Sequence, residues 1–313
     1  MKISVVIPVR NEGAAFPLTL RFFAKLQQHF ELELIVLDDA SDPPVVDLPA
    51  GMRLVRHNWR QGIARSRNAA ARLATGDILL QTDGHVFFSA PDLHRLIEAV
   101  DDHTIIGART QLINDFSQFE RRQTDSLNAP DYYGWRWAFA PELSVVAVRT
   151  PPSTEPHDVP FTGCACLAMR RQLFETLGGF DGGLFGCGNF EDADLALRAW
   201  ALGYRVRMLP SVTCYHYTAS QPAPNGRGRS PLDLPRYDGS LCNALRILRR
   251  HLPTARFEML TAQLAKQFPE SWSDLPAAFV TQLSSAEAAQ SAWEPRRVRS
   301  REWVVRKMLG EEP

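Results

Sequence analysis

Two side chains suited to chemistry, Asp83 and His85, stand two positions apart, and Asp83 comes three residues after an apolar run at 78–80. Side chains alternate along an extended segment, so both point to the same side. A carboxylate and an imidazole suit Mn²⁺ or Mg²⁺, with phosphate oxygens and water completing the shell, better than a closed zinc cage. His216 ends another predicted strand and is a third candidate ligand. The alternative is that Asp83 and His85 cap a turn and that His216 is a packed aromatic.

A second group of acids, Glu191, Asp192 and Asp194, lies in the stretch NFEDADLALR at the start of a predicted helix. One of them could act as a general base on an acceptor hydroxyl, or could position the acceptor. Carboxylates also favour the positive N-terminal end of a helix, so capping is the alternative for one or two of these residues. The local sequence leaves both explanations open.

Further polar residues follow the second predicted strand and open the next helix. Asp38 and Asp39 end the strand, and one of them can accept a hydrogen bond from the imide of a nucleotide base. Arg65 and Arg67 lie about one helical turn from the same place and could face a phosphate or a base. A solvated helix face is the alternative for these arginines.

The first hundred residues carry the elements that must position these groups. Apolar strand signals alternate with helical spacing, which predicts a mostly parallel sheet with helices on both faces. In such sheets ligands bind beyond the carboxyl ends of the strands. We therefore expect Glu12, Asp39 and Asp83 to share one edge of the sheet. The expected strands span 3–9, 32–41, 52–58 and 77–83, and the expected helices span 17–30 and 62–76, the latter stopped by Gly76.

The second half is less regular. Residues 161–180 predict a strand, a turn and a helix, and residues 191–202 predict an amphipathic helix that is closed by Gly203 and followed by a strand. The stretch 220–240 is rich in Pro, Gly and Arg and is expected to be a long mobile loop. Its Arg227 and Arg229 are candidate phosphate contacts if the loop closes as a lid; a passive connector is the alternative.

Composition narrows the class of protein. The 313 residues carry 35 basic and 35 acidic side chains, a formal net charge of zero that favours no nucleic-acid partner. No apolar run approaches the roughly 20 residues of a membrane span, and the N-terminus reads as a first strand rather than a signal peptide. Five cysteines without zinc-type spacing predict reduced thiols and a cytoplasmic location.

The ordered set of motifs resembles family 2-type glycosyltransferases of the GT-A fold. The motifs are SVVIPVRNE, IVLDDAS, GIARSRNAAARLATGDILLQTDGH, GGFD and FEDADLALRAW. Three further features resemble the catalytic domain of polypeptide N-acetylgalactosaminyltransferases: D-x-H in place of D-x-D with a later histidine in YHY, the aromatic YYGWRWAF, and LCNALRILRRH. Together these matches cover roughly residues 3–250.

The resemblance implies a metal-dependent transferase that uses a nucleotide-diphosphate sugar, with a UDP-sugar expected. It implies a GT-A domain over 1–240, divided near residue 115 into nucleotide and acceptor halves, and a helical extension over 241–313. It assigns the metal, Mn²⁺ or Mg²⁺, to Asp83, His85 and His216, catalytic or acceptor work to Glu191 and Asp192, and the nucleotide to Pro8, Glu12, Asp39, Arg67 and Asp83.

Several alternatives stay open at this stage. GCGNFEDADL mixes two patterns, so the sequence names neither a retaining nor an inverting route, and it names neither the sugar, the acceptor (saccharide, peptide or small molecule) nor the oligomeric state. A catalytically inactive sugar-nucleotide-binding protein of the same fold is one rival. A nucleotidyltransferase is another, although PVRNEGAAF lacks the Gly-rich, basic loop expected of that class.

Overall fold

The computed structural model describes residues 1–13, 15–113, 131–139, 145–163, 165–184, 190–217, 238–267 and 277–311. The strands of the first half are β1 (Ile3–Val9), β2 (Leu32–Asp38), β3 (Met52–Arg56), β4 (Ile78–Thr82), β5 (Val86–Phe88) and β6 (Thr104–Ile113). Those of the second half are β7 (Trp135–Phe139), β8 (Val145–Arg149), β9 (His157–Asp158), β10 (Cys166–Arg170) and β11 (Arg205–Tyr217).

The helices before residue 218 are α1 (Ala15–Leu26), α2 (Ile63–Ala71), α3 (Ala90–Glu98), α5 (Arg171–Leu177) and α6 (Glu191–Ala201). The C-terminal part contains α7 (Asp238–His251), α8 (Thr254–Gln267), α10 (Ala277–Ser291), the 3₁₀ turn η1 (Glu294–Arg296) and α11 (Arg301–Met308). Every strand and helix expected in the first hundred residues is present, and the mainly helical C-terminal part is confirmed.

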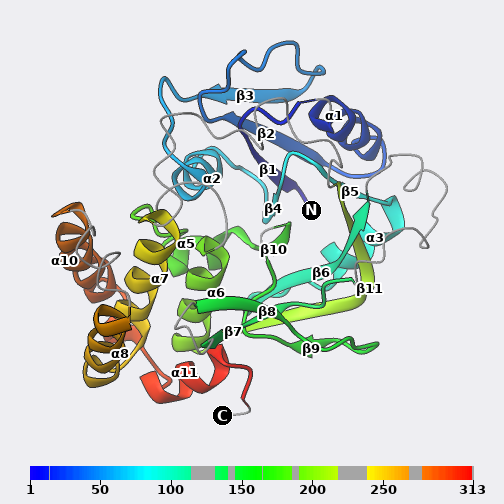
Figure 1. Cartoon of the computed structure of the whole chain (residues 1–313). Coiled ribbons are helices and arrows are strands. Elements are labelled where there is room, and N and C mark those ends of the chain that lie inside the picture. The colour runs from blue at the N-terminus through cyan, green and yellow to red at the C-terminus, as the bar shows by residue number, and fades with distance from the viewer. Residues whose placement is uncertain are drawn as a thin grey trace.

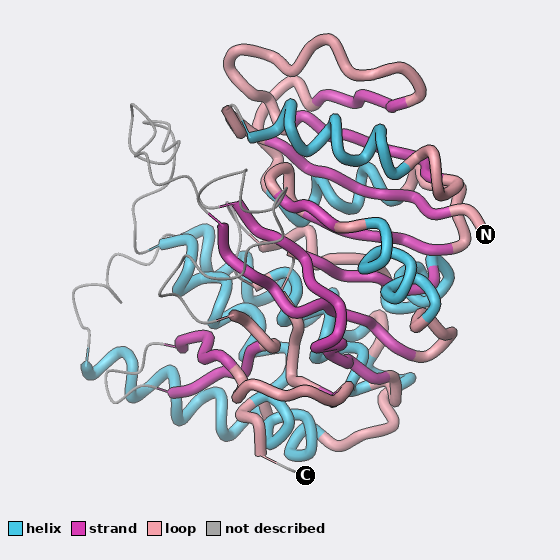
Figure 2. Tube along the Cα trace, turned by 90° about the vertical axis from the view of Figure 1, so that its right-hand side faces the viewer, coloured by secondary structure: helices cyan, strands magenta, loops and turns pink. Residues whose placement is uncertain are grey.

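Nine of the described strands form one sheet in the order β3-β2-β1-β4-β10-β6-β11-β5, with β9 beside β11. Figure 1 labels the strands, and Figure 2 shows strands running side by side in a view turned by 90°. The four strands β3, β2, β1 and β4 run parallel, as the sequence predicts. In the second half only β6 and β11 pair in parallel, while β10, β5 and β9 pair antiparallel with their neighbours. The carboxyl ends of the parallel strands β1, β2 and β4 therefore form the shared edge. The strand β11, from the mixed half of the sheet, ends near the same edge because it pairs with β5, which follows β4.

Alternate side chains of the strands point to opposite faces of the sheet and enter two separate cores. On β1, Val5 and Ile7 pack with the apolar faces of α1 and α3, whereas Val6 packs with α2, α5 and α6. Helices thus cover both faces, which confirms the predicted α/β architecture. The helices α7 and α11 contribute to the same core as α6, so the described part of the C-terminal extension packs against the sheet-bearing half (Figure 1).

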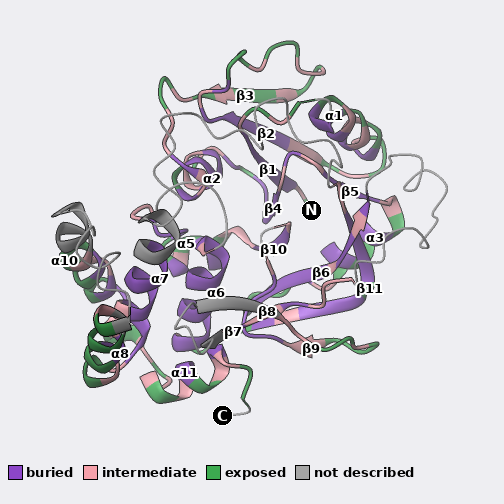
Figure 3. Ribbon diagram, in the orientation of Figure 1, coloured by how far each residue is buried: buried purple, intermediate pink, exposed green. Residues whose placement is uncertain are grey.

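The helix α6 differs from its predicted amphipathic character, because all eleven of its residues are buried (Figure 3). It packs against β11 on one side and against α5 and α11 on others. The prediction was wrong because the polar positions, such as Arg198, face buried carboxylates and carbonyls instead of water.

Gly76 also has a different role from the helix stop that was expected. The helix α2 already ends at Ala71, and Gly76 lies where the chain passes the start of β1. A Cβ atom at Gly76 would lie 2.7 Å from the backbone nitrogen of Ser4. The glycine therefore permits the close approach of two chain segments. None of the helices described here is long and apolar enough to cross a membrane.

Candidate functional site

The predicted edge exists, because β1, β2 and β4 are parallel and end together. Hydrogen bonds join the loops that follow β1 and β2. Arg10 donates to the carbonyl oxygens of Asp39 and Ala40, both at 2.9 Å. The backbone amide of Asn11 donates to Ser41 Oγ at 3.1 Å. The turn after β4 carries Asp83 and lies beside them. Three loops from separate parts of the sequence therefore form one polar surface.

Asp83, His85 and His216 converge at this edge. Their ligand atoms all lie within 4.8 Å of one another. His85 Nε2 and His216 Nε2 are 3.2 Å apart, and His216 Nε2 is 3.6 Å from an oxygen of Asp83. Each side chain remains about a quarter exposed, so the cluster is open to a ligand. The expectation that these residues come together is confirmed, and a turn-capping role does not explain the three-way convergence.

Strand pairing explains how two histidines separated by 131 residues meet. β5, directly after the turn, pairs antiparallel with the end of β11, so that His216 lies opposite Val86. The Tyr217 amide also donates to the His85 carbonyl at 2.9 Å. The turn itself is tight, because a Cβ atom at Gly84 would lie 2.9 Å from a side-chain carbon of Val9.

The charge of Asp83 is stabilised by its surroundings. Burial alone would raise the pKa of Asp83, but the neighbouring His216 and the guanidinium of Arg67 hold that pKa well below its usual range. Arg67 Nη2 donates to Asp83 at 2.6 Å, and its side chain is completely buried. Asp83 is therefore an ionised carboxylate with one oxygen held by Arg67.

Arg67 also connects the two acidic centres. Its Nε lies 4.0 Å from an oxygen of Glu191, and its guanidinium lies 5.9 Å from the centre of the Phe180 ring. One buried cation thus stands between the cluster around Asp83 and the first turn of α6. These contacts of the guanidinium are internal, and the nucleotide contact expected for Arg67 stays a prediction.

The acid pair at the start of α6 is buried. Glu191 and Asp192 lie in the first turn, and the residue before them, Phe190, provides no side-chain cap. Burial and the adjacent Glu191 raise the pKa of Asp192 to about 7. A carboxyl group with such a pKa exchanges its proton near neutral pH, which is the property required of a general base or acid.

The third acid, Asp194, belongs to a buried network of charges. Its oxygens accept from Arg198 at 3.0 Å, Arg250 at 2.7 Å and His251 at 3.1 Å. Burial opposes ionisation, but the two arginines hold the pKa of Asp194 far below its usual range. Arg250 also donates to Asp181 at 2.6 Å. Asp194 therefore anchors α7 to α6, and it is structural.

The acids after β2 make internal contacts as well. Asp38 is fully buried and accepts from the amides of Ser41 and Val45 and from Arg56. Asp39 accepts from the amides of Gln61 and Gly62, at 2.7 and 2.9 Å, just before α2. Pro8 is a buried residue of β1. Nucleotide contacts of Pro8 and Asp39 stay predictions.

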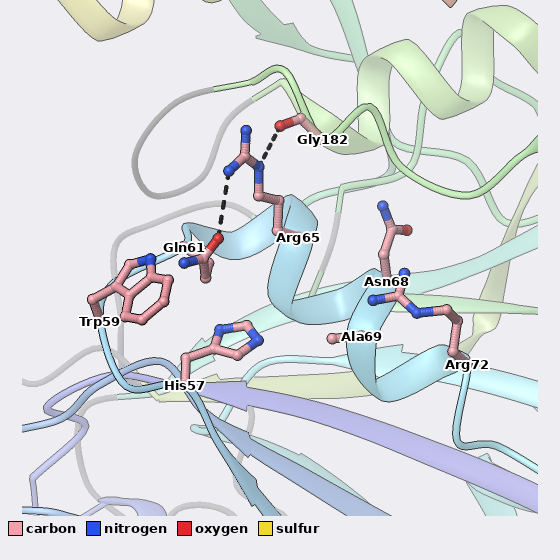
Figure 4. Close-up of a pocket in the computed structure, with 8 residues that line it drawn as sticks. All are labelled: His57, Trp59, Gln61, Arg65, Asn68, Ala69, Arg72 and Gly182. Carbon is pink, nitrogen blue, oxygen red and sulfur yellow. Dashed lines mark hydrogen bonds between the residues drawn. The ribbon is translucent and has the colours of Figure 1, made fainter.

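A cavity of about 490 Å³ lies between α2 and the loop that precedes it (Figure 4). Trp59, Arg65 and Arg72 line it, and Arg65 is held by the Gly182 carbonyl at 2.7 Å. His57 lines the cavity and also contacts Asp39. The three residues of the cluster at Asp83 are not among its lining, so this cavity is separate from the candidate metal site.

Glu12 makes a contact that was not predicted from the sequence, because its Oε2 lies 2.6 Å from His85 Nδ1. The nucleotide contact expected for Glu12 stays a prediction. The sequence contained an indication of the contact with His85, because Glu12 lies three residues after β1, at the same edge of the sheet as the turn that carries Asp83. Arg227 and Arg229, with the predicted lid, lie outside the described residues.

The chain is similar in sequence to known proteins. A family model described as glycosyl transferase family 2 matches residues 4–178. Human polypeptide N-acetylgalactosaminyltransferase 10 is 28% identical over 223 residues, which cover 66% of this chain and 36% of the human protein. The mouse inactive polypeptide N-acetylgalactosaminyltransferase-like protein 5 is 30% identical over 203 residues, which cover 58% of this chain and 44% of the mouse protein. The chain thus spans less than half the length of these relatives.

Among solved structures, the crystal structure of GalNAc-T7 with UDP, GalNAc and Mn²⁺ superposes with a TM-score of 0.68 at 19% identity. The match covers 98% of this chain and 56% of that one. The GT-A fold expected from the sequence is thereby confirmed.

Proposed function

Because the chain belongs to glycosyl transferase family 2, we propose that it is a metal-dependent enzyme that transfers a sugar from a nucleotide-diphosphate sugar to a hydroxyl-bearing acceptor. A UDP-sugar is the proposed donor, since the GalNAc-T7 structure of the same fold contains UDP. The cytoplasmic location also stays a proposal, supported by the free thiols of Cys166 and Cys214.

The observation that carries the proposal is the convergence of Asp83, His85 and His216 at the carboxyl ends of the parallel strands. Ligands on adjacent corners of an octahedral Mn²⁺ or Mg²⁺ site lie roughly 3 Å apart. The 3.2 Å between the two Nε2 atoms fits that spacing. One carboxylate and two imidazoles would leave the other positions for diphosphate oxygens and water, and the bound ion would offset charge on the leaving diphosphate.

The buried side chains around this cluster have complementary roles in the proposal. Arg67 holds one oxygen of Asp83, so the carboxylate keeps its orientation. On the other side of Arg67, Glu191 and Asp192 supply the acidic groups, and the raised pKa of Asp192 suits proton exchange with an acceptor hydroxyl. Whether the sugar is transferred with retention or inversion is decided by the anomer of the product.

A donor-hydrolysis panel tests the proposal. The chain is incubated with individual nucleotide sugars and Mn²⁺, and free nucleoside diphosphate is measured. We expect turnover of one donor, its loss with chelator, and its loss in Asp83→Asn and His216→Ala. Asp102→Asn and His94→Ala are matched controls, because both side chains are exposed and pair with residues outside the cluster, Asp102 with Arg170 and His94 with Glu98. Chelator-resistant turnover, or full activity in either cluster variant, would overturn the metal assignment.

A catalytically inactive sugar-nucleotide-binding protein is the second candidate, because one relative is named as inactive. The same panel separates the two. Calorimetry that detects Mn²⁺-dependent binding of a nucleoside diphosphate, with no donor turnover for any acceptor supplied, would favour the binding protein. Membership of the glycosyltransferase family gives no support to the nucleotidyltransferase alternative.

A further inference from the structure

We propose that Glu12 is a positioning residue that sets the tautomer and orientation of His85, and that it does not serve as a nucleotide contact. The proposal rests on the metal site of the proposed function. Its physical basis is the short contact of 2.6 Å between Glu12 Oε2 and His85 Nδ1.

The tautomer follows from the chemistry of the two groups. A carboxylate only accepts hydrogen bonds, so the proton in this contact is carried by His85 Nδ1. The lone pair of the neutral ring is then on Nε2, the atom that faces His216 and the Asp83 carboxylate. Carboxylates that hold the second nitrogen of a metal-binding histidine fix the ring and raise its basicity as a ligand. Glu12 has this geometry toward His85.

The two histidines differ in this respect. His216 Nδ1 is buried and has no hydrogen-bond partner among the described residues. Its Nε2 lies 3.2 Å from His85 Nε2, so in the absence of a cation one of these two nitrogens carries a proton that the other accepts. Because Glu12 assigns the proton of His85 to Nδ1, His216 is the ring that donates from Nε2. Among the described residues, Glu12 thus fixes the tautomer of His85 that can bind a cation through Nε2, and no carboxylate does the same for His216.

Packing holds Glu12 in place. Gly84 leaves room for it, since a Cβ atom there would lie 3.1 Å from Glu12 Cγ. Thr19 Oγ1 donates to the Gly84 carbonyl at 2.7 Å, which ties the turn to α1. The Glu12 side chain is about one-fifth exposed. The carboxylate is thus directed at the imidazole by the shape of the turn.

The test uses Glu12→Ala and the isosteric Glu12→Gln, with Glu98→Gln as the matched control, because Glu98 forms an exposed pair with His94. Long-range ¹H–¹⁵N NMR spectra of histidine-labelled, metal-free protein report the tautomer of each ring, and a His85→Ala sample assigns the signal. We expect the Nδ1–H form of His85 in the unaltered chain and in Glu98→Gln, and loss of that preference in Glu12→Ala.

Two binding measurements complete the test. Electron paramagnetic resonance of free Mn²⁺ should show roughly 10- to 100-fold weaker binding in Glu12→Ala, with a smaller loss in Glu12→Gln. The UDP affinity at saturating Mn²⁺ should stay within twofold. An unchanged His85 tautomer in Glu12→Ala would overturn the proposal, as would a tenfold loss of UDP affinity with normal Mn²⁺ binding. If the unaltered chain binds no Mn²⁺, the proposed function fails, whereas the NMR result still decides the contact.

Discussion

The Asp192→Asn substitution should make the protein more stable and less active at the same time. In the folded chain the pKa of Asp192 is raised to about 7, against an ordinary value of 3.8. The native state therefore binds more protons than the unfolded state between these pH values, and stability falls as pH rises from about 4 to 7. The difference corresponds to about 4 kcal/mol above pH 7. An amide at this position has no charge to bury, so the variant should regain most of that energy.

The assay is urea or thermal unfolding at closely spaced pH values, with transfer measured in parallel. Over 313 residues, about 4 kcal/mol corresponds to a rise in Tm of roughly 6 °C at pH 8. Transfer should fall by roughly 10²- to 10⁴-fold if Asp192 is the base. Asp102→Asn, at an exposed site, should change neither quantity. An identical pH dependence of stability in Asp192→Asn and the unaltered chain between pH 4 and 7 would refute the reasoning.

Two further substitutions test the architecture around the site. Arg250→Met should lower the free energy of unfolding by about 3–5 kcal/mol, because Asp181 and Asp194 lose a buried partner. The control is Arg171→Met, at a half-buried arginine whose carboxylate partner Glu175 is exposed. If urea denaturation shows a loss in Arg250→Met no larger than in Arg171→Met, the network is contradicted. Gly84→Ala should weaken Mn²⁺ binding at least tenfold and cost about 1–3 kcal/mol, because its methyl group would lie 2.9 Å from a β1 side chain. Calorimetric titration checks this, and unaltered Mn²⁺ affinity would show that the turn tolerates the group.

The edge of the sheet was predictable because its signals are local. Glu12, Asp39 and Asp83 each follow an apolar strand run within three residues, and parallel strands bring such ends together without further information. The metal cluster required one more step, since His216 comes from β11. Its place beside His85 depends on antiparallel pairing of β5 with β11, which apolar periodicity does not encode.

Contacts between side chains of distant segments could not be predicted. The link from Asp83 through Arg67 to Glu191 depends on where α6 begins relative to α2. The same limit explains why α6 was expected to be amphipathic, because a charged residue such as Arg198 reads as solvated until its buried partners are known. Spacing along one element predicts which face a residue occupies, whereas the partner of a buried charge is set by tertiary packing.

The most direct test of the central claim is anomalous diffraction at the manganese edge from crystals grown with UDP and Mn²⁺. The account predicts one strong peak bounded by a carboxylate oxygen of Asp83 and the Nε2 atoms of His85 and His216, each at about 2.0–2.3 Å. Diphosphate oxygens should complete the shell. A crystal that contains UDP but shows no anomalous peak among these three side chains, or shows its strongest peak beside Glu191 and Asp192, would contradict it.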